Sequence, residues 1–196
     1  MKTNNSQLSS DSPLEIKTTR LLLRQWKTKD FKKFAQMNSD PDVMAYYPNI
    51  MNESESNAMA EKIQNLIAER GWGFWAVEVL SNSGFIGFVG LHKPHYKLPI
   101  TPCIEIGWRL SKECWGKGYA TGAGQESLKF AFERLNLKEV YSFASVGNLK
   151  SRAVMERLNM INTKSNFNHP MILDGNPLKE HVLYKIDKQS WIKNYQ

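Results

Sequence analysis

Cysteines, long apolar runs and an apolar leader are what this sequence lacks. Its 196 residues include two cysteines, Cys103 and Cys114, which are too few for a disulfide framework and are expected to be packed, reduced thiols. No apolar run approaches the ~20 residues that a membrane-spanning helix needs. The polar N-terminal residues also lack the apolar stretch of a secretory signal. The sequence therefore excludes a membrane-spanning or disulfide-stapled protein and predicts a cytoplasmic one.

Acidic residues are scarce relative to basic ones, 19 against 26, which gives a formal net charge of +7. Part of the excess falls in residues 1–33, whose basic residues are Lys2, Lys17, Arg20, Arg24, Lys27, Lys29, Lys32 and Lys33. A basic surface attracts phosphate-bearing ligands and nucleic acids. No helix-turn-helix, RNP or zinc-finger pattern accompanies the charge. Contact with nucleic acid is therefore expected only indirectly, through a ribosomal target, and otherwise these residues form a solvated charged face.

The length of the chain predicts a single domain. A chain of 196 residues can bury one core but is short for two, and no linker or repeat interrupts it. We expect a flexible tail over residues 1–13 and one domain over residues 14–196, as a monomer or a homodimer. His92, His95 and the two cysteines match no familiar zinc spacing, so no metal site is expected.

The most informative segment is a glycine-rich turn, Trp-Gly-Lys-Gly-Tyr-Ala, over residues 115–120. It lies between a strand-like run over residues 104–110 and a helical pattern. Two glycines at i and i+2 allow a tight turn and bring backbone N–H groups close to a ligand. The N-terminus of the next helix adds unpaired N–H groups and the positive end of its dipole, so this turn is expected to hold a phosphate group. The spacing is neither that of a P-loop nor that of a Rossmann turn, because Gly122 comes one position too late.

This turn and two other segments carry a family resemblance. Trp115-x-x-Gly118-x-Ala120 resembles the pyrophosphate loop Gln/Arg-x-x-Gly-x-Gly/Ala of the GNAT N-acetyltransferases, with Trp115 in place of Gln or Arg. Residues 148–160 are similar to the motif Asn-x-x-Ser-x-x-x-x-Glu-x-x-Gly-Φ, which in that family closes over the pantetheine arm and the thiol. Residues 16–24 look like the opening strand of the RimJ/RimL-like subgroup, which contains the ribosomal-protein N-terminal acetyltransferases. The matches occur in the family's order and cover residues 14–186.

The resemblance implies an α/β fold with one mixed, mostly antiparallel, twisted sheet. The sheet is expected to have about seven strands, flanked by helices and splayed between strands 4 and 5. The residue patterns predict a strand over 21–26, a helix with Asp30 as its N-cap, a helix over 54–70 ended by Gly71, a hairpin of 74–79 with 85–92, and strands over 140–145, 161–167 and 178–186.

The cofactor that the resemblance implies is acetyl-CoA, with its pantetheine arm paired to the fourth strand. Carried over to this sequence, the residues expected to bind it are Trp108, Arg109, Leu110, Trp115, Gly116, Lys117, Gly118, Tyr119, Ala120, Thr121, Asn148 and Ser151.

The implied reaction is acetyl transfer to a primary amine by direct attack, through a tetrahedral intermediate. The amine must lose a proton, and Glu105 matches the Glu of the subgroup's Glu-Ile-Gly-Tyr/Trp strand, either as general base or as a salt-bridged structural residue. Strand N–H groups near Trp108 are candidate donors to the oxyanion. Met155 replaces the tyrosine that many family members use as general acid. Ser151 matches the serine of the subgroup, either as that acid or as a helix-capping hydroxyl.

The acceptor is the least determined part of the reaction. Its pocket is expected to be lined by Tyr46, Tyr47, Trp75, His95 and Glu105, with Met44, Trp72 and Tyr96 as further candidate wall residues. The RimJ/RimL-like resemblance favours a protein N-terminal α-amine of ribosomal-protein type. A small amine such as a polyamine, an amino acid or an antibiotic is the alternative, and fold likeness cannot choose between them. A different class, a catalytically weak regulator that binds CoA or nucleic acid, is suggested by Trp115, Met155 and the basic surface.

Overall fold

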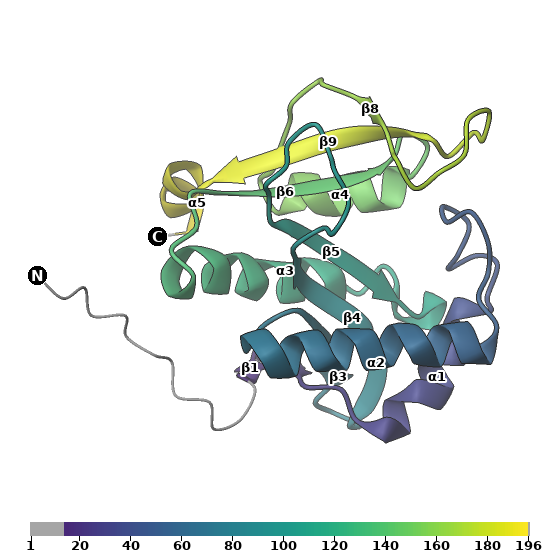
Figure 1. Cartoon of the computed structure of the whole chain (residues 1–196). Coiled ribbons are helices and arrows are strands. Elements are labelled where there is room, and N and C mark those ends of the chain that lie inside the picture. Colours follow the sequence, from purple (N-terminus) through teal and green to yellow (C-terminus); the bar gives the residue numbers. More distant parts are fainter. Residues whose placement is uncertain (1–13, 196) are drawn as a thin grey trace, which may run out of the picture.

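The computed structural model describes residues 14–195, so the predicted tail and Lys2 lie outside the described part. Its described strands form one sheet of nine, in the order β1-β2-β3-β4-β5-β6-β9-β7, with β8 paired to β9 (Figure 1). The strands are β1 (Ile16–Lys17), β2 (Leu21–Arg24), β3 (Phe74–Val79), β4 (Gly84–His92), β5 (Glu105–Leu110), β6 (Glu139–Ser145), β7 (Ile161–Asn162), β8 (Phe167–Asn168) and β9 (Glu180–Asp187). The α-helices are α1 (Thr28–Asn38), α2 (Glu53–Arg70), α3 (Tyr119–Lys129), α4 (Leu149–Arg157) and α5 (Lys188–Tyr195). A 3₁₀ turn, η1 (Lys112–Cys114), precedes α3, and a π-helical turn, η2 (Phe130–Arg134), follows it.

The sheet is antiparallel except where β5 meets β6. β4 and β5 share six register pairs, whereas the parallel β5 and β6 share the single pair Glu105↔Tyr141. The two strands therefore separate beyond Glu105. If the two-residue β1 is left out of the count, β5 and β6 are strands 4 and 5, and the predicted splay is confirmed. The sheet has nine strands where about seven are predicted, and three of them, β1, β7 and β8, have only two residues each.

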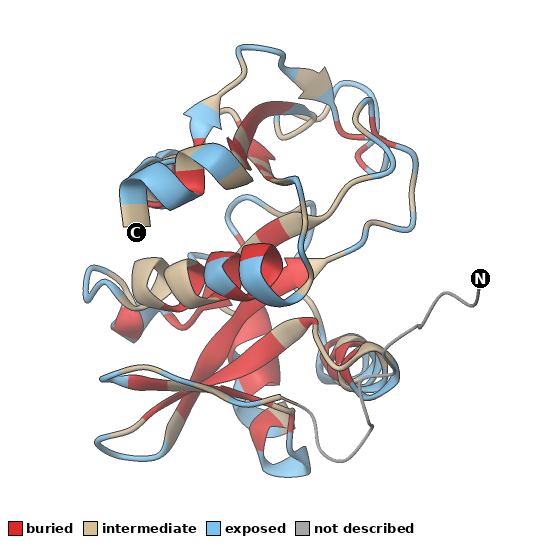
Figure 2. Cartoon of the chain, turned by 90° about the vertical axis from the view of Figure 1, so that its left-hand side faces the viewer, coloured by how far each residue is buried: buried red, intermediate tan, exposed pale blue. Residues whose placement is uncertain are grey.

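Helices cover both faces of the sheet. α1 and α2 lie on one face, where Phe34 packs edge-on against Phe88 of β4, and α3 lies on the other, where Phe130 packs against Trp75 of β3. Figure 2 shows the buried residues concentrated in the central strands and on the helix surfaces that meet them. The face under α1 and α2 is called the acceptor face below.

The long helix α2 begins and ends where the sequence predicts, within one residue. The side chain of Asn52 accepts the N–H of Glu55 at 2.9 Å, and the Glu55 carboxylate accepts the N–H of Asn52 at 2.8 Å. This reciprocal capping satisfies two of the unpaired donors at the helix start. Gly71 ends the helix in a left-handed conformation with φ of 78°, as expected.

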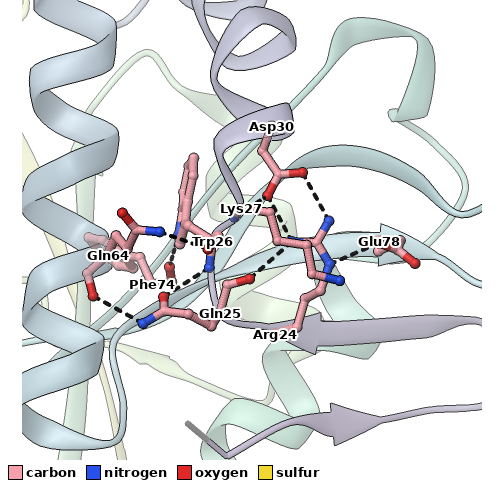
Figure 3. A network of polar contacts seen from close by, with 8 residues as sticks. All are labelled: Arg24, Gln25, Trp26, Lys27, Asp30, Gln64, Phe74 and Glu78. Carbon is pink, nitrogen blue, oxygen red and sulfur yellow. Dashed lines mark hydrogen bonds and ion pairs between the residues drawn. The ribbon is translucent and has the colours of Figure 1, made fainter. Parts of the chain in front are cut away.

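A buried ionic network ties β2, α1 and β3 together (Figure 3). The guanidinium of Arg24 is fully buried and lies 2.7 Å from Asp30 and 2.8 Å from Glu78. Arg24 is therefore not part of the solvated basic face predicted for the N-terminal third. Asp30 is not the N-cap of α1 either. The helix is capped at Lys27, and Asp30, in the first turn, accepts the Lys27 N–H at 2.8 Å while it neutralises the buried cation.

Candidate active site

The glycine-rich turn after β5 has the geometry of an anion site. Gly116 and Gly118 have left-handed backbones, with φ of 73° and 75°, a conformation that favours glycine. The N–H of Gly122 donates to the C=O of Gly118 at 3.0 Å, so the N–H groups of residues 119–121 have no partner within α3. A β-carbon at Gly116 would meet no atom within 4 Å. The turn is thus an open cradle of N–H groups at the positive end of α3, which suits a phosphate.

Two side chains brace this cradle. Arg20 donates Nη1 to the C=O of Lys117 at 2.9 Å, and its guanidinium lies 5.1 Å from the centre of the Tyr119 ring. Trp115 donates its indole N–H to the C=O of Leu110 at 2.8 Å. Arg20 therefore brings a positive charge to the cradle. No local pattern in the sequence indicates this role, because Arg20 and Lys117 are 97 positions apart.

The N-terminus of α4 lies next to the cradle. The side chain of Asn148 accepts the N–H of Ser151 at 3.1 Å, so Asn148 supplies the cap. The Ser151 hydroxyl has no hydrogen bond with any described residue, and Ser151 is half-buried. The ammonium of Lys150 lies 4.1 Å from the centre of the Trp115 ring, which joins the two segments. Met155 is buried in the core, 1% exposed, and cannot replace the missing tyrosine as an acid.

The separation of β5 and β6 leaves backbone groups of β5 facing a gap. The N–H of Ser111 bonds to the C=O of Ile86, so by alternation the odd-numbered residues of β5 pair with β4 and the even-numbered ones face β6. The C=O of Ile106 accepts the Ser142 hydroxyl at 2.9 Å. The next even residue, Trp108, has no register partner on β6. Its N–H and C=O are therefore directed into the gap, where an extended ligand could pair with β5.

Glu105 lies where β5 and β6 are still paired. The side chains of β5 alternate between faces, so Glu105 shares the acceptor face with Gly107 and Arg109. The Glu105 carboxylate makes no hydrogen bond or ion pair with any residue among 14–195, which is contrary to a salt-bridged structural role. Burial raises the pKa of Glu105 to about 8. The carboxyl group can therefore exchange a proton near pH 8, which is the property of a general base for an amine.

The connection between α1 and α2 lies over the end of the gap. Arg109, 6% exposed, donates to the side chain of Asn38 at 2.8 Å, and its guanidinium stacks 4.0 Å from the centre of the Tyr47 ring. Tyr46 lies against Gly147, 3.6 Å from the place of a β-carbon there. The two tyrosines thus reach from β5 to the β6–α4 connection. Arg109 serves as a brace on the acceptor face, whereas the sequence assigned it to the cofactor.

A cluster of aromatic and histidine side chains lies near Glu105, and the sequence indicated Tyr96 as an acceptor-pocket candidate but missed His169 and His181. Tyr96 Oη and His169 Nε2 are 3.2 Å apart, and the rings of His169 and His181 are 4.8 Å apart. Burial raises the pKa of Tyr96, and the negative charge of Glu105 raises it further. Burial lowers the pKa of His169 to about 4. The cluster joins the loop after β4 to the β8–β9 hairpin. No local motif could reveal it, because Tyr96 and His169 are 73 positions apart.

Trp75 does not line the acceptor pocket. It is fully buried on the α3 face, with its ring 5.2 Å from that of Phe130. Its neighbour Phe74 lies on the acceptor face instead, stacked 5.2 Å from His92. Alternation in the sequence separates the two faces of β3 but does not say which face meets the acceptor. The exposed His95 does lie on this side, with its ring 5.2 Å from that of Tyr96.

Other chemistry has little structural support in the described part of the chain. Among residues 14–195, no group of three or more His, Cys, Asp or Glu side chains is arranged to hold a metal ion. Across the same residues, no helix has the length and apolar character needed to cross a bilayer. Both cysteines are free thiols, and burial raises the pKa of Cys103 to about 11, which disfavours a nucleophilic thiolate.

Known proteins are similar to this chain in sequence and in fold. The family model for the acetyltransferase (GNAT) domain matches residues 20–161. A Bacillus subtilis protein described as the uncharacterized N-acetyltransferase YnaD is 28% identical over 179 residues, which span 91% of this chain and 99% of the relative. The crystal structure of a GNAT-family acetyltransferase from Bacillus anthracis has a TM-score of 0.74 and 27% identity, and the match covers 90% of this chain and 99% of that one.

Two more distant structures have the same fold but different acceptors. The ribosomal-protein-S5-alanine acetyltransferase of Vibrio fischeri is 16% identical with a TM-score of 0.70, over 91% of this chain and 98% of its own. The spermidine N-acetyltransferase of Vibrio cholerae, in complex with CoA and spermine, is 20% identical with a TM-score of 0.69, over 89% and 99%. At such identities the likeness concerns the fold and leaves the acceptor open. The family model, by contrast, matches more than half of the chain, and the chain belongs to the GNAT acetyltransferases.

Proposed function

We propose that this N-acetyltransferase uses acetyl-CoA and Glu105 to acetylate the α-amine of a protein N-terminus, in the manner of RimJ/RimL-like enzymes. The observation that carries the proposal is the unpaired Glu105 carboxylate on the acceptor face, whose pKa burial raises to about 8. A protein α-amine has a pKa of about 7.7–8.0. Glu105 and such an amine therefore hold a proton with nearly equal affinity, and both are partly deprotonated near pH 8.

The same comparison disfavours the alternative of a lysine-like or polyamine acceptor. A primary amine with a pKa of about 10.4 is protonated almost entirely at pH 8. A carboxylate with a pKa of about 8 would have to remove a proton that such an amine holds more tightly than the carboxylate does. Glu105 thus favours an acceptor whose own pKa is low, as that of an α-amine is.

The residues around the splay are suited to the cofactor. The cradle of residues 116–121 would hold the pyrophosphate on its N–H groups, with Arg20 and Lys117 beside it. The backbone C=O of Trp108 would pair with the pantetheine arm in the gap between β5 and β6. When bound, acetyl-CoA supplies an activated acetyl group as a thioester.

The chain's own groups then have separate roles in the transfer. Glu105 accepts the proton of the acceptor amine, directly or through a water, as the amine nitrogen bonds to the acetyl carbon. The N–H of Trp108 donates to the carbonyl oxygen as negative charge develops there. The C–S bond breaks, and the Ser151 hydroxyl, which has no partner among the described residues, can donate a proton to the departing sulfur while it takes up another from water.

Replacing Ser151 with alanine is expected to lower kcat by less than about tenfold. A thiol with a pKa of about 8.5 already leaves readily as a thiolate near neutral pH, so an acid assists without being indispensable. The deficit should shrink as the pH rises above about 8.5, because the thiolate then needs no proton. Steady-state assays from pH 6.5 to 9.5 measure this. A loss as large as that of a Glu105 variant, and independent of pH, would assign Ser151 a different role.

A turnover screen tests the proposed acceptor class. Purified protein and acetyl-CoA are incubated in parallel with short peptides, spermidine, free amino acids and an aminoglycoside, and the released CoA thiol is measured. The proposal expects the peptides to be acetylated most efficiently. Preferred turnover of spermidine or an aminoglycoside would establish a small-molecule enzyme. A protein that binds acetyl-CoA but acetylates nothing on the panel would instead be a regulator.

A further inference from the structure

The acceptor face contains a cavity. It lies between α2 and the adjoining ends of β3 and β4, and its volume is about 180 Å³. Ligand sites for whole drug-sized molecules are larger, about 300–1,000 Å³, so this cavity suits one side chain or small substituent of the acceptor. It is called the α2 pocket below.

The α2 pocket opens next to the proposed base. His92, which lines it, is the register partner of Glu105 across β4 and β5. Directly paired residues on neighbouring antiparallel strands project from the same face, with their β-carbons about 5 Å apart. An acceptor whose amine meets Glu105 can therefore place a group from its first residue in the α2 pocket.

The walls of the α2 pocket are apolar, and its charges are all positive. Trp72 and Phe74 are among its apolar lining, Lys62 and Arg70 supply the charges, and no aspartate or glutamate lines it. Neither Lys62 nor Arg70 forms an ion pair or a hydrogen bond with any residue among 14–195. Arg70 is half-buried and Lys62 is exposed. A half-buried cation without a partner is a site that a bound anion would complete.

The two histidines of the α2 pocket are consistent with this charge. Burial, together with the nearby positive charges of Arg70, His95 and Lys62, lowers the pKa of His92 to about 4. His92 is therefore neutral at physiological pH and keeps one N–H to donate, while its ring stacks on Phe74. The exposed His95 adds a second imidazole at the same opening.

We infer that the α2 pocket binds a carboxylate of the acceptor, held by Arg70 with Lys62 at the rim, so that the enzyme prefers acceptors with an acidic group next to the reacting amine. The inference rests on the proposed function and specifies its substrate class. Two sources supply this chemistry: the side chain of an N-terminal glutamate or aspartate in a peptide, and the α-carboxylate of a free amino acid. A polycation such as spermidine is disfavoured by the same charges.

Isosteric acceptors test the inference. For the wild-type protein, kcat/KM is expected to be at least about tenfold higher for the tripeptide Glu-Ala-Ala than for Gln-Ala-Ala, because charge-assisted bonds are stronger than neutral ones. Arg70→Gln should reduce this ratio to about twofold or less, mainly by lowering kcat/KM for Glu-Ala-Ala, and Arg70→Glu should favour Lys-Ala-Ala. Arg134→Gln, an exposed charge of η2 far from the α2 pocket, is the matched control and should keep the wild-type ratio.

Further measurements distinguish the two sources of the carboxylate and separate failure of the inference from failure of the proposed function. Free glutamate that is turned over better than Glu-Ala-Ala would identify the free amino acid as the source of the carboxylate. Equal kcat/KM for Glu-Ala-Ala and Gln-Ala-Ala in the wild type, or an unchanged ratio in Arg70→Gln, overturns the inference while the proposed function stands. If no peptide is acetylated, the proposed function fails, and calorimetry with CoA present still decides the pocket. The product N-acetyl-Glu-Ala-Ala should then bind the wild type at least about tenfold more tightly than Arg70→Gln, and equal binding overturns the inference.

Discussion

Replacing Glu105 with glutamine is expected to lower kcat by about 100-fold or more without changing the dissociation constant of acetyl-CoA. Glutamine keeps the size and shape of the side chain but cannot accept a proton from the amine. The cradle and the gap that would bind acetyl-CoA do not involve the Glu105 side chain, which lies on the acceptor face. Steady-state kinetics with calorimetry of acetyl-CoA binding separate the two effects.

The pH dependence gives the same substitution a second readout. Because the pKa of Glu105 is raised to about 8, kcat/KM of the wild type should rise with pH and level off above about 8. The acceptor amine titrates in the same range, so the profile is compared with that of Glu105→Gln on the same peptide. The inflection due to the enzyme should be absent from the variant. Identical profiles, with only a small loss of rate, would make Glu105 structural.

The raised pKa also predicts how stability depends on pH. Between the ordinary pKa of 4.5 and about 8, the folded protein holds a proton on Glu105 that the unfolded chain has lost. The folded state binds more protons in this window, so the free energy of unfolding should fall as the pH rises through it. Denaturant unfolding at pH 5 and pH 9 should show a smaller decrease for Glu105→Gln than for the wild type. An equal decrease in both proteins would contradict the raised pKa.

Replacing Gly118 with valine is expected to weaken acetyl-CoA binding by at least about tenfold, or about 1.4 kcal/mol. Gly118 has φ of 75°, a conformation that is strongly disfavoured for a β-branched residue. A β-carbon there would also lie 3.4 Å from Nη2 of Arg20. The cradle must shift, and its N–H groups then no longer converge on one anion. Calorimetric titration with acetyl-CoA measures the loss.

Gly175→Val is the matched control for this substitution. Gly175 has φ of 83° in the connection before β9, with open space around its Cα, so valine there introduces similar strain away from the cradle. Both variants should lose stability, but only Gly118→Val should lose affinity for acetyl-CoA. If the folded Gly118→Val protein binds acetyl-CoA as tightly as the wild type does, the cradle is not the pyrophosphate site.

Local patterns in the sequence predicted the parts of the site that local structure builds. The glycines of residues 116–118 are needed by a left-handed turn. The sequence indicates Ser151 as a capping candidate, whereas in the structure Asn148, three residues earlier, caps α4 by accepting the Ser151 N–H. The splay itself came from the family resemblance. These features can be recognised in a short stretch of sequence because the residues that form them are close together in the chain or belong to a known motif.

Contacts between distant segments could not be predicted in this way. Arg20 reaches the cradle from the start of β2, and Asp30 neutralises the buried Arg24 from the first turn of α1 rather than standing at the N-cap position. The sequence places Trp75 in a strand but does not say toward which face of the sheet its side chain points. Only its packing against Phe130 shows that Trp75 belongs to the core. These roles depend on how the sheet brings remote residues together, a fact that no window of sequence contains.

The most direct test of the account is a single peptide that offers both kinds of amine. Glu-Ala-Lys-Ala is incubated with the protein and acetyl-CoA from pH 6.5 to 9, and tandem mass spectrometry locates the acetyl group. We predict acetylation of the N-terminal α-amine, with a rate that rises up to about pH 8, and little modification of the lysine, whose amine has a pKa of about 10.4. Preferential acetylation of the lysine ε-amine, or a rate unaffected by Glu105→Gln, would contradict the account.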